Sequence, residues 1–304
     1  MKNKNDILRI RSISEAHQVL GFNKPGHPLV TVFDAAKYVI PDHMVGVPFT
    51  TDLYTIALKD GSCGMDYGRN RYDFEEGVMI FTAPNQVMTA TRDQQEHTVE
   101  GWMLLFHPDL IRRSPLGETI GSYSFFSYDV YEALHLSDEE INTVTACVNN
   151  IKNEYEKRID NHSQRVIVSN IELLLNYSSR FYERQFNTRT NQNKDIVSQV
   201  EGYMREYYQD EKLAETGPLS IQYLAGRVHL STNYLSDLLR KETGRSAKDH
   251  INDFVIDKAK NKLLGGRESV SEIAYSLGFN YPHYFSRLFK ARTGMTPQEY
   301  RELS

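Results

Sequence analysis

The last third of the chain contains the same pattern twice. In the first copy, Leu224-Ala225 leads to Tyr234-Leu235-Ser236 and ends at Thr243-Gly244. The same landmarks return as Ile273-Ala274, Tyr284-Phe285-Ser286 and Thr293-Gly294. The later landmarks lie 50 positions apart and the earlier ones 49, so the second copy has one extra residue between its helices. Two amphipathic helices joined by a small-residue turn indicate a helix-turn-helix unit, and two units favour contact with two successive major grooves of one duplex.

Each copy divides into a buried and an exposed side. In the first copy, about 219–241, Ser220 and Ser231 are placed to cap two helices. We expect the inward residues of its second helix to be Tyr234, Leu235, Leu238 and Leu239, and the outward ones to be Thr232, Asn233, Ser236, Asp237 and Arg240. In the second copy, about 270–291, Gly278 supplies the turn. Here we expect Phe285, Leu288 and Phe289 inside, and Tyr281, His283, Ser286, Arg287 and Lys290 outside.

A continuous helix is predicted between the two copies. It runs from Ile251 to Leu264 and is ended by Gly265-Gly266. A rigid connection of this kind would hold both reading helices about 34 Å apart, which is one turn of the duplex.

Length and charge are compatible with a second, different domain. At 304 residues the chain has room for about two domains. The net charge of −5 disfavours a nucleic acid partner, but residues 217–304 hold 13 Lys and Arg against 9 Asp and Glu. A mildly basic end on an acidic body fits a DNA-binding module joined to another domain. Cys63 and Cys147 are too few for a zinc cluster, and no apolar run is long enough for a membrane span, so we expect a cytoplasmic protein.

The N-terminal part has the pattern of short strands. Leu53 to Lys59, Gly77 to Pro84 and Gly101 to Phe106 are apolar or alternating segments closed by turn residues, as at Asp60-Gly61. No long helical segment separates these strands, which favours an antiparallel barrel or sandwich over a parallel sheet. The predicted class is therefore α+β, with a β domain over residues 1–136.

Helices are predicted from residue 137 onward. Ser137 and Glu140 have capping-box spacing, and a heptad-like stripe follows them, consisting of Ile141, Val144, Val148, Ile151 and Tyr155. A second helix after Asn161 completes a hairpin over 137–186. The stripe fits two interpretations, either packing on the β domain or forming a homodimer interface. The polar segment 187–194 is predicted as an exposed linker, with Asp195 capping the first helix of a DNA-binding domain over 195–304.

One stretch resembles a known family. Residues 278–290, followed by Gly294 to Pro297 and Tyr300-Arg301, resemble the signature of the AraC/XylS family of bacterial transcription regulators. The resemblance implies a cupin-like antiparallel β-barrel that senses an effector, a helical hairpin that joins protomers, and a double helix-turn-helix domain that binds double-stranded DNA. It also implies RNA polymerase as a partner, while leaving activator and repressor open.

The resemblance assigns roles on the second helix of each copy. The implied base-reading residues are Asn233, Ser236, Asp237, His283, Ser286 and Arg287. Residues expected at the DNA backbone are Thr232, Arg240, Lys241, Tyr281, Lys290 and Arg292. Arg287 can hold guanine O6 and N7, and Asn233 can pair with adenine. Asp237 departs from the family, in which a basic or amide residue is usual. Its carboxylate can accept from cytosine N4 but also repels phosphates, so we expect the first copy to read DNA more weakly.

No catalytic centre is predicted. The chain has no His-x-His pair, and Val87 and Met88 follow Pro84 where a metal ligand would lie, so we expect neither an enzyme nor a cofactor. The effector is not identified by the sequence. A polar-aromatic pocket for it would draw on Tyr54, Tyr67, Arg69, Arg71, Tyr72 and Trp102. Two alternatives stay open, namely a cupin-type metal enzyme with a helical appendage and a constitutive regulator whose barrel only dimerises.

Overall fold

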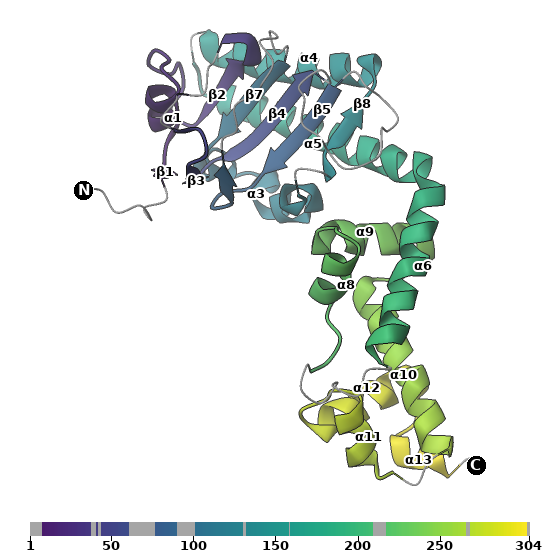
Figure 1. The fold of residues 1–304 in the computed structure, drawn as a ribbon. Coiled ribbons are helices and arrows are strands. Elements are labelled where there is room, and N and C mark those ends of the chain that lie inside the picture. Colours follow the sequence, from purple (N-terminus) through teal and green to yellow (C-terminus); the bar gives the residue numbers. More distant parts are fainter. Residues whose placement is uncertain are drawn as a thin grey trace. The chain divides into compact units, whose positions relative to one another are not determined.

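The computed structural model separates the chain into two compact units, residues 1–188 and 189–304 (Figure 1). It describes residues 8–37, 41, 44–60, 77–89, 101–129, 132–157, 159–208, 217–265 and 268–302. The expected turn at Asp60-Gly61 extends beyond these residues, because Gly61 is not among them. Among the described residues, no helix is both long enough and apolar enough to cross a membrane.

A five-stranded antiparallel sheet forms the centre of the first unit. Its strands are β2 (Val30–Asp34), β7 (Gly101–Phe106), β4 (Tyr54–Asp60), β5 (Gly77–Thr82) and β8 (Leu134–Leu136), in that spatial order. β4, β5 and β7 are the three strands that the sequence predicts. Every neighbouring pair is antiparallel, as the sequence pattern predicts.

The first unit also contains a second, three-stranded sheet. It consists of β1 (Leu8–Ile10), β3 (Pro48–Thr51) and β6 (Val87–Thr89), with β1 parallel to β3. The described strands therefore form two open sheets and do not close into a barrel. Residues 61–76 and 90–100, which follow β4 and β6, are outside the described part, so the cupin-like barrel stays a prediction.

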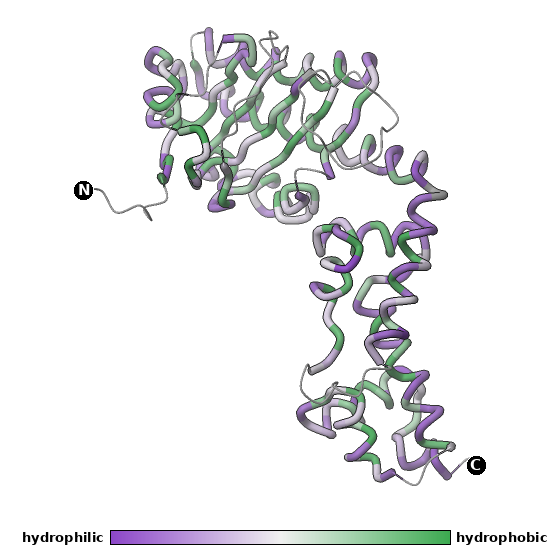
Figure 2. Tube along the Cα trace, in the orientation of Figure 1, coloured by the Kyte–Doolittle hydropathy of each residue, from purple (hydrophilic) through white to green (hydrophobic). Residues whose placement is uncertain are grey.

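Side chains alternate between the two faces of the five-stranded sheet, and helices cover one of these faces. The cross-strand pairs Leu58–Trp102, Ile56–Leu104 and Tyr54–Phe106 all lie on this face. Two long helices pack on it, α4 (Asp138–Glu156) and α5 (Ser163–Thr188). Figure 2 shows hydrophobic residues gathered in the strands, which is the pattern of a sheet whose face is buried.

The start of α4 is fixed as the sequence predicts. The Ser137 hydroxyl accepts from the Glu140 amide, and the Glu140 carboxylate accepts from the Ser137 amide. The same carboxylate pairs with Arg184 of α5 at 2.9 Å. One glutamate therefore caps a helix and joins the two helices of the hairpin.

Short helices complete the first unit. They are α1 (Ile13–Val19), η1 (Ala35–Lys37), α2 (Pro108–Ile111), α3 (Pro115–Thr119), η3 (Ile120–Ser122) and η4 (Ser124–Ser127). η4 contributes Phe125 and Phe126, whose rings pack on Phe81 of β5. This aromatic group extends the core beyond the end of the sheet.

The second unit is helical throughout its described part. Its helices are α6 (Thr190–Tyr207), α8 (Ile221–Arg227), α9 (Thr232–Thr243), α10 (Ala247–Gly265), α11 (Val270–Ser276), α12 (Pro282–Thr293) and α13 (Pro297–Arg301). The linker predicted over 187–194 is instead almost wholly helical, in the end of α5 and the start of α6. Asp195 lies inside α6 and does not cap it, since the N-cap is Arg189. Asn193 is buried, which shows why polarity alone was a poor guide here.

Candidate nucleic-acid interface

The first helix-turn-helix copy consists of α8 and α9. Ser220 caps α8 by accepting from the Tyr223 amide, and Ser231 caps α9 by accepting from the Tyr234 amide. Both caps were predicted from the sequence. α9 ends at Gly244, which has a left-handed φ of 73°.

The second copy consists of α11 and α12 and has a longer turn. Four residues separate α8 from α9, whereas five separate α11 from α12, which is the extra residue seen in the sequence repeat. Ser269 and Glu272 form a capping box at the start of α11, and hydrogen bonds with Ser269 lower the pKa of Glu272. α12 has Pro282 at its first turn, where the missing amide costs nothing.

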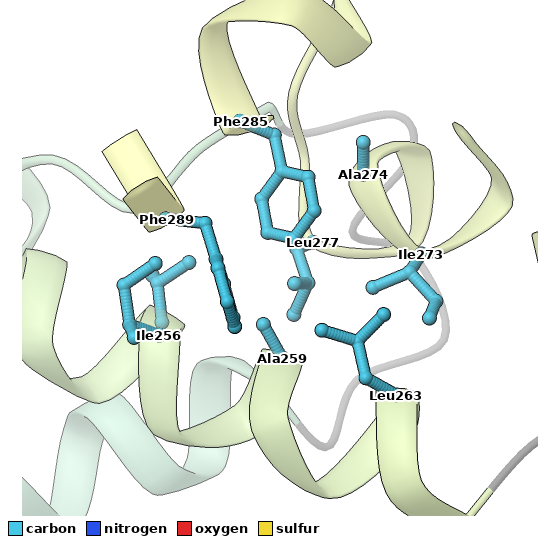
Figure 3. Packing of buried hydrophobic residues seen from close by; sticks show 9 residues of the cluster. Ile256, Ala259, Leu263, Ile273, Ala274, Leu277, Phe285 and Phe289 are labelled. Carbon is cyan, nitrogen blue, oxygen red and sulfur yellow. The ribbon is translucent and has the colours of Figure 1, made fainter. Parts of the chain in front are cut away.

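The second helix of each copy, α9 or α12, is called its reading helix. The inward sides of both reading helices are buried as expected. Tyr234, Leu235, Leu238 and Leu239 of α9 are all at most 4% exposed. Phe285 and Phe289 of α12 are fully buried, and Leu288 is partly buried against the same core. Figure 3 shows the two phenylalanines directed toward Ile256, Ala259 and Leu263 of α10. Each reading helix is therefore fixed by apolar packing on one side and left with the other side for a partner.

The outward side of α9 is polar. Asn233, Arg240 and Lys241 are exposed, whereas Thr232, Ser236 and Asp237 are half-buried. The Ser236 hydroxyl donates to the Thr232 carbonyl at 2.7 Å, so it has only its lone pairs left for a base. The predicted residues of this copy thus lie on one helix and differ in accessibility.

The outward side of α12 is more basic and more aromatic. His283, Arg287 and Lys290 are exposed and Ser286 is half-buried. The Tyr281 side chain is 59% exposed. These positions are the ones that the sequence placed outside.

Sequence reasoning missed Tyr284. Its counterpart Tyr234 is 4% exposed, but Tyr284 is 48% exposed. Its ring lies 4.2 Å from the His283 ring, and the Arg287 guanidinium lies 5.4 Å from its centre. The one available signal was the extra residue in the second turn, since the two tyrosines occupy matched positions of a repeat whose turns differ.

Arg292 has intramolecular partners. Its guanidinium forms ion pairs with Asp249 and Asp253 of α10. An arginine held between two carboxylates is not placed to neutralise a phosphate. These ion pairs give Arg292 a role within the domain, and its contact with the DNA backbone stays a prediction.

The predicted effector pocket is not assembled by the described residues. Trp102 is 6% exposed and its indole N–H donates to Thr145 of α4 at 3.0 Å. Tyr54 stacks on Phe106 with ring centroids 5.0 Å apart, and burial raises the pKa of Tyr54. Both residues belong to the contact between sheet and helices, which corrects their assignment to a pocket. The other four candidates, Tyr67, Arg69, Arg71 and Tyr72, lie outside the described residues.

The stripe on α4 is used within the protomer. Val144, Val148, Ile151 and Tyr155 are between 0% and 7% exposed. Ile141 packs so closely over Gly77 of β5 that a Cβ atom there would lie 2.7 Å from its Cδ1. These five residues bind the hairpin to the sheet, so the prediction of a dimer interface at them is wrong.

Metal-binding and thiol groups are sparse in the described part of the chain. No three His, Cys, Asp or Glu side chains gather there closely enough to hold a metal ion. Cys147 is buried in α4, and burial raises the pKa of its thiol.

The helical end of the chain matches a known family model, and parts of the chain are similar to known proteins. A family model described as a helix-turn-helix domain matches residues 224–303. The uncharacterized HTH-type transcriptional regulator YfiF of Bacillus subtilis is 30% identical over 152 residues, which are 50% of this chain and 45% of that protein. The HTH-type transcriptional activator RhaR of Yersinia pseudotuberculosis is 37% identical over 68 residues, 22% of this chain and 23% of that protein. The chain thus covers less than half of either relative.

Among solved structures, the C-terminal domain of AraT, a response regulator from Geobacillus stearothermophilus, is similar to the same end. The sequences are 28% identical, the match covers 36% of this chain and 85% of that chain, and the TM-score is 0.32.

The turn of the second copy is the tightest point of the site. Gly278 has a φ of +85°, and a Cβ added there would lie 2.9 Å from the backbone of Gly217. The matched residue of the first copy is His229, which adopts a φ of +56°. Both turns need the left-handed region, but only the second excludes a side chain. The segment before α8 therefore packs directly on the second copy.

We expect Gly278→Ala to destabilise the protein more than Gly294→Ala. Both glycines have positive φ, but a Cβ at Gly294 would meet nothing within 4 Å. Gly294→Ala should cost about 1–2 kcal/mol for the left-handed backbone. Gly278→Ala should cost roughly 2–5 kcal/mol, because overpacking adds about 1–3 kcal/mol. Urea unfolding of the two variants measures the difference, and equal losses would contradict the close packing at Gly278.

Proposed function

We propose that this chain, whose C-terminal part is an AraC-type helix-turn-helix domain, is a sequence-specific DNA-binding transcription regulator. The observation that supports this most directly is the pair of reading helices α9 and α12. Ser231 caps the start of α9, and Pro282 begins α12. Both helices are buried on one side and polar on the other. Two such helices in one unit fit two successive major grooves, and α12 exposes Tyr284 where α9 buries Tyr234.

The base contacts are proposed for six side chains. They are Asn233, Ser236 and Asp237 on α9 and His283, Ser286 and Arg287 on α12. The phosphate contacts are proposed for Arg240, Lys241 and Lys290, with Thr232 and Tyr281 at the helix starts. Arg287 is the strongest base reader among them, because its exposed planar guanidinium matches the two acceptors of guanine.

Partners other than DNA are proposed from the relatives and from the family resemblance. RhaR, one of the relatives, is named a transcriptional activator, which favours RNA polymerase as a partner here. We also propose that the first unit binds a small effector, as the resemblance to a family with a cupin-like sensor implies. Ligand binding would then change how the second unit engages DNA, as a shift between populations. The place of action is the cytoplasm, where bacterial DNA is found.

A homodimer is proposed through α5. Val166 and Leu173 are 40% and 44% exposed and lie seven residues apart on this 26-residue helix. Half-buried Asn170 and Tyr177 repeat the same spacing between and beyond them. Two exposed apolar side chains at heptad spacing fit a second copy of the same helix, and two-fold dimers are the commonest assembly of soluble proteins.

The direct test of the proposed function is selection from a random pool of duplexes. Purified full-length protein should enrich one motif with two boxes, and footprinting should show protection of two successive major grooves on one side of the duplex. No enrichment of any sequence, with and without candidate metabolites, would refute the proposal.

Arg287→Ala should weaken binding to the enriched site by about 1–3 kcal/mol and relax the preference at one base pair. The reason is the loss of a bidentate contact to one base. Competition binding with duplexes altered at each position measures the loss of affinity and the change in base preference. Unchanged affinity and unchanged preference would show that α12 does not read bases through this residue.

Lys290→Ala serves as the matched variant on the same helix. Its loss should weaken all duplexes about equally and lower the slope of log K against log salt by about one unit, because one phosphate contact releases about one counterion. Titrations at several salt concentrations measure the slope. A change confined to one base pair would instead make Lys290 a base reader.

Leu173→Glu should reduce dimerisation without unfolding the protomer, because the residue is exposed on α5 and a charge there opposes apolar contact. Sedimentation equilibrium gives the dimer constant, which we expect to weaken at least about tenfold. Asn149→Glu, at an exposed position of α4, is the control and should leave it unchanged. Equal dimerisation of Leu173→Glu and the parent would exclude this face.

A further inference from the structure

The two helix-turn-helix copies do not share one hydrophobic core. The first copy packs Leu224 and Leu235 against α6, around Val200 and Met204. The second packs Phe285 and Phe289 against the later part of α10. Among the described residues, Tyr208 and Ile251 pack against both clusters, and both are only partly buried. Apolar packing thus fixes each reading helix within its own copy, and the angle between the copies needs further contacts.

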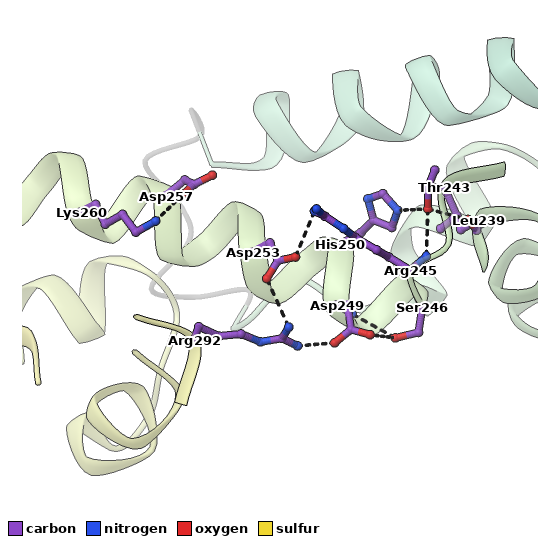
Figure 4. Close-up of polar contacts among 10 residues, drawn as sticks. All are labelled: Leu239, Thr243, Arg245, Ser246, Asp249, His250, Asp253, Asp257, Lys260 and Arg292. Atoms are coloured by element: carbon purple, nitrogen blue, oxygen red, sulfur yellow. Dashed lines mark hydrogen bonds and ion pairs between the residues drawn. The ribbon is translucent and has the colours of Figure 1, made fainter. Parts of the chain in front are cut away.

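Polar contacts join the copies across the first half of α10 (Figure 4). Arg292, near the end of α12, pairs with Asp249 and with Asp253, the latter at 3.4 Å. Asp253 is also paired at 3.4 Å with Arg245, which lies between α9 and α10. The Asp253 carboxylate is therefore shared by two arginines. Arg245 follows α9, and Arg292 lies near the end of α12.

The first copy is fixed to the same stretch of α10. At the end of α9, the Thr243 hydroxyl donates to the Leu239 carbonyl at 2.6 Å, and its oxygen lies 2.7 Å from Nε2 of His250. Ser246 donates to the Asp249 carboxylate at 2.6 Å and accepts from the Asp249 amide. The end of α9, the start of α10 and the end of α12 are thus linked in one network.

The charges of this network are balanced and ordered. Two arginines, Arg245 and Arg292, face two aspartates, Asp249 and Asp253. Hydrogen bonds from Ser246 and Arg292 lower the pKa of Asp249 to about 2, so its carboxylate is charged at neutral pH. The Arg292 side chain is 31% exposed, against 64% for Arg245 and 39% for Arg227. A planar guanidinium between two carboxylates one turn apart permits few orientations.

We propose that Arg292 is a positioning residue that, through Asp249 and Asp253, fixes the angle between the reading helices α9 and α12 and thereby sets the spacing of base-pair boxes that the protein accepts. The proposal rests on the proposed DNA-binding function. A base pair inserted between two boxes turns one box about the duplex axis by roughly 35° and moves it by about 3.4 Å. A rigid reader cannot follow that change. Without the contacts of Arg292, the copies stay joined by α10, its partly buried neighbours and the packing of Gly217 on Gly278, and they can adjust.

The experiment measures spacing selectivity in full-length protein. The probes are the duplex enriched from the random pool and two derivatives with one base pair inserted or removed between its boxes. The parent should bind both derivatives about tenfold more weakly or worse, comparable to the cost of a poorly matched base pair. In Arg292→Ala and in the double variant Asp249→Asn with Asp253→Asn, the ratio should fall to about threefold or less.

Two controls separate the network from general effects of charge. Lys260→Ala removes an ion pair to Asp257 at 3.0 Å that lies wholly within α10, so the spacing ratio should stay that of the parent. Lys290→Ala should weaken all three duplexes equally. Arg292→Lys keeps the charge but loses the planar fork, so its ratio should lie between those of the parent and Arg292→Ala. Circular dichroism confirms that every variant is folded.

The salt dependence distinguishes positioning from a phosphate contact. If Arg292 positions α12, Arg292→Ala leaves the slope of log K against log salt within about half a unit of the parent. A drop of about one unit with an unchanged spacing ratio would make Arg292 a phosphate contact and overturn the proposal. A parent protein that tolerates all three spacings would overturn it as well. Failure of the parent to enrich any sequence is a different result, which refutes the DNA-binding function itself.

Discussion

The burial of α10 against two separate helical cores is the constraint on which the second unit depends. Its first turns contribute Ala247 to the core of the first copy, and its later turns contribute Val255, Ile256, Ala259 and Leu263 to the second. A helix that is apolar toward two partners at different points cannot rotate about its axis without exposing one of them. Both reading helices therefore take their positions from one shared element, and the polar network at its first half restricts the remaining freedom.

The helical end could be predicted from the sequence because local signals and long-range packing agree there. Ser220, Ser231 and Gly278 specify caps and a turn through chemistry that acts within a few residues. Apolar spacing then predicts which sides are buried, as at Leu235 and Phe285. The repeat supplies a second, independent copy of each signal. Tyr284 was not predicted, because the matched Tyr234 is buried and the repeat alone does not distinguish the two tyrosines.

The first unit was harder to predict, because an apolar stripe does not show which surface covers it. The α4 stripe has the spacing of a helix-helix interface, and the same spacing serves a helix on a sheet, where Val144 and Ile151 are buried. Trp102 and Tyr54 have the composition of a ligand pocket, yet the pleat of β4 and β7 directs them to the helix-covered face. The polar segment around Asn193 is helical, and the side-chain amide of Asn193 donates to Glu242 of α9.

The two copies have the same fold but different surfaces, and this difference divides the work between them. Asp237 on α9 is replaced in the outward pattern of α12 by Arg287, and Tyr284 adds an exposed ring beside it. An acidic side chain opposes the phosphates that a cationic one attracts, so α12 gains more than α9 from the same approach to a groove. If α12 gives most of the sequence preference, α9 contributes mainly through where it is placed. The contribution of α9 to DNA binding then depends on a fixed angle between α9 and α12. The contacts of Arg292 across α10 restrict this angle.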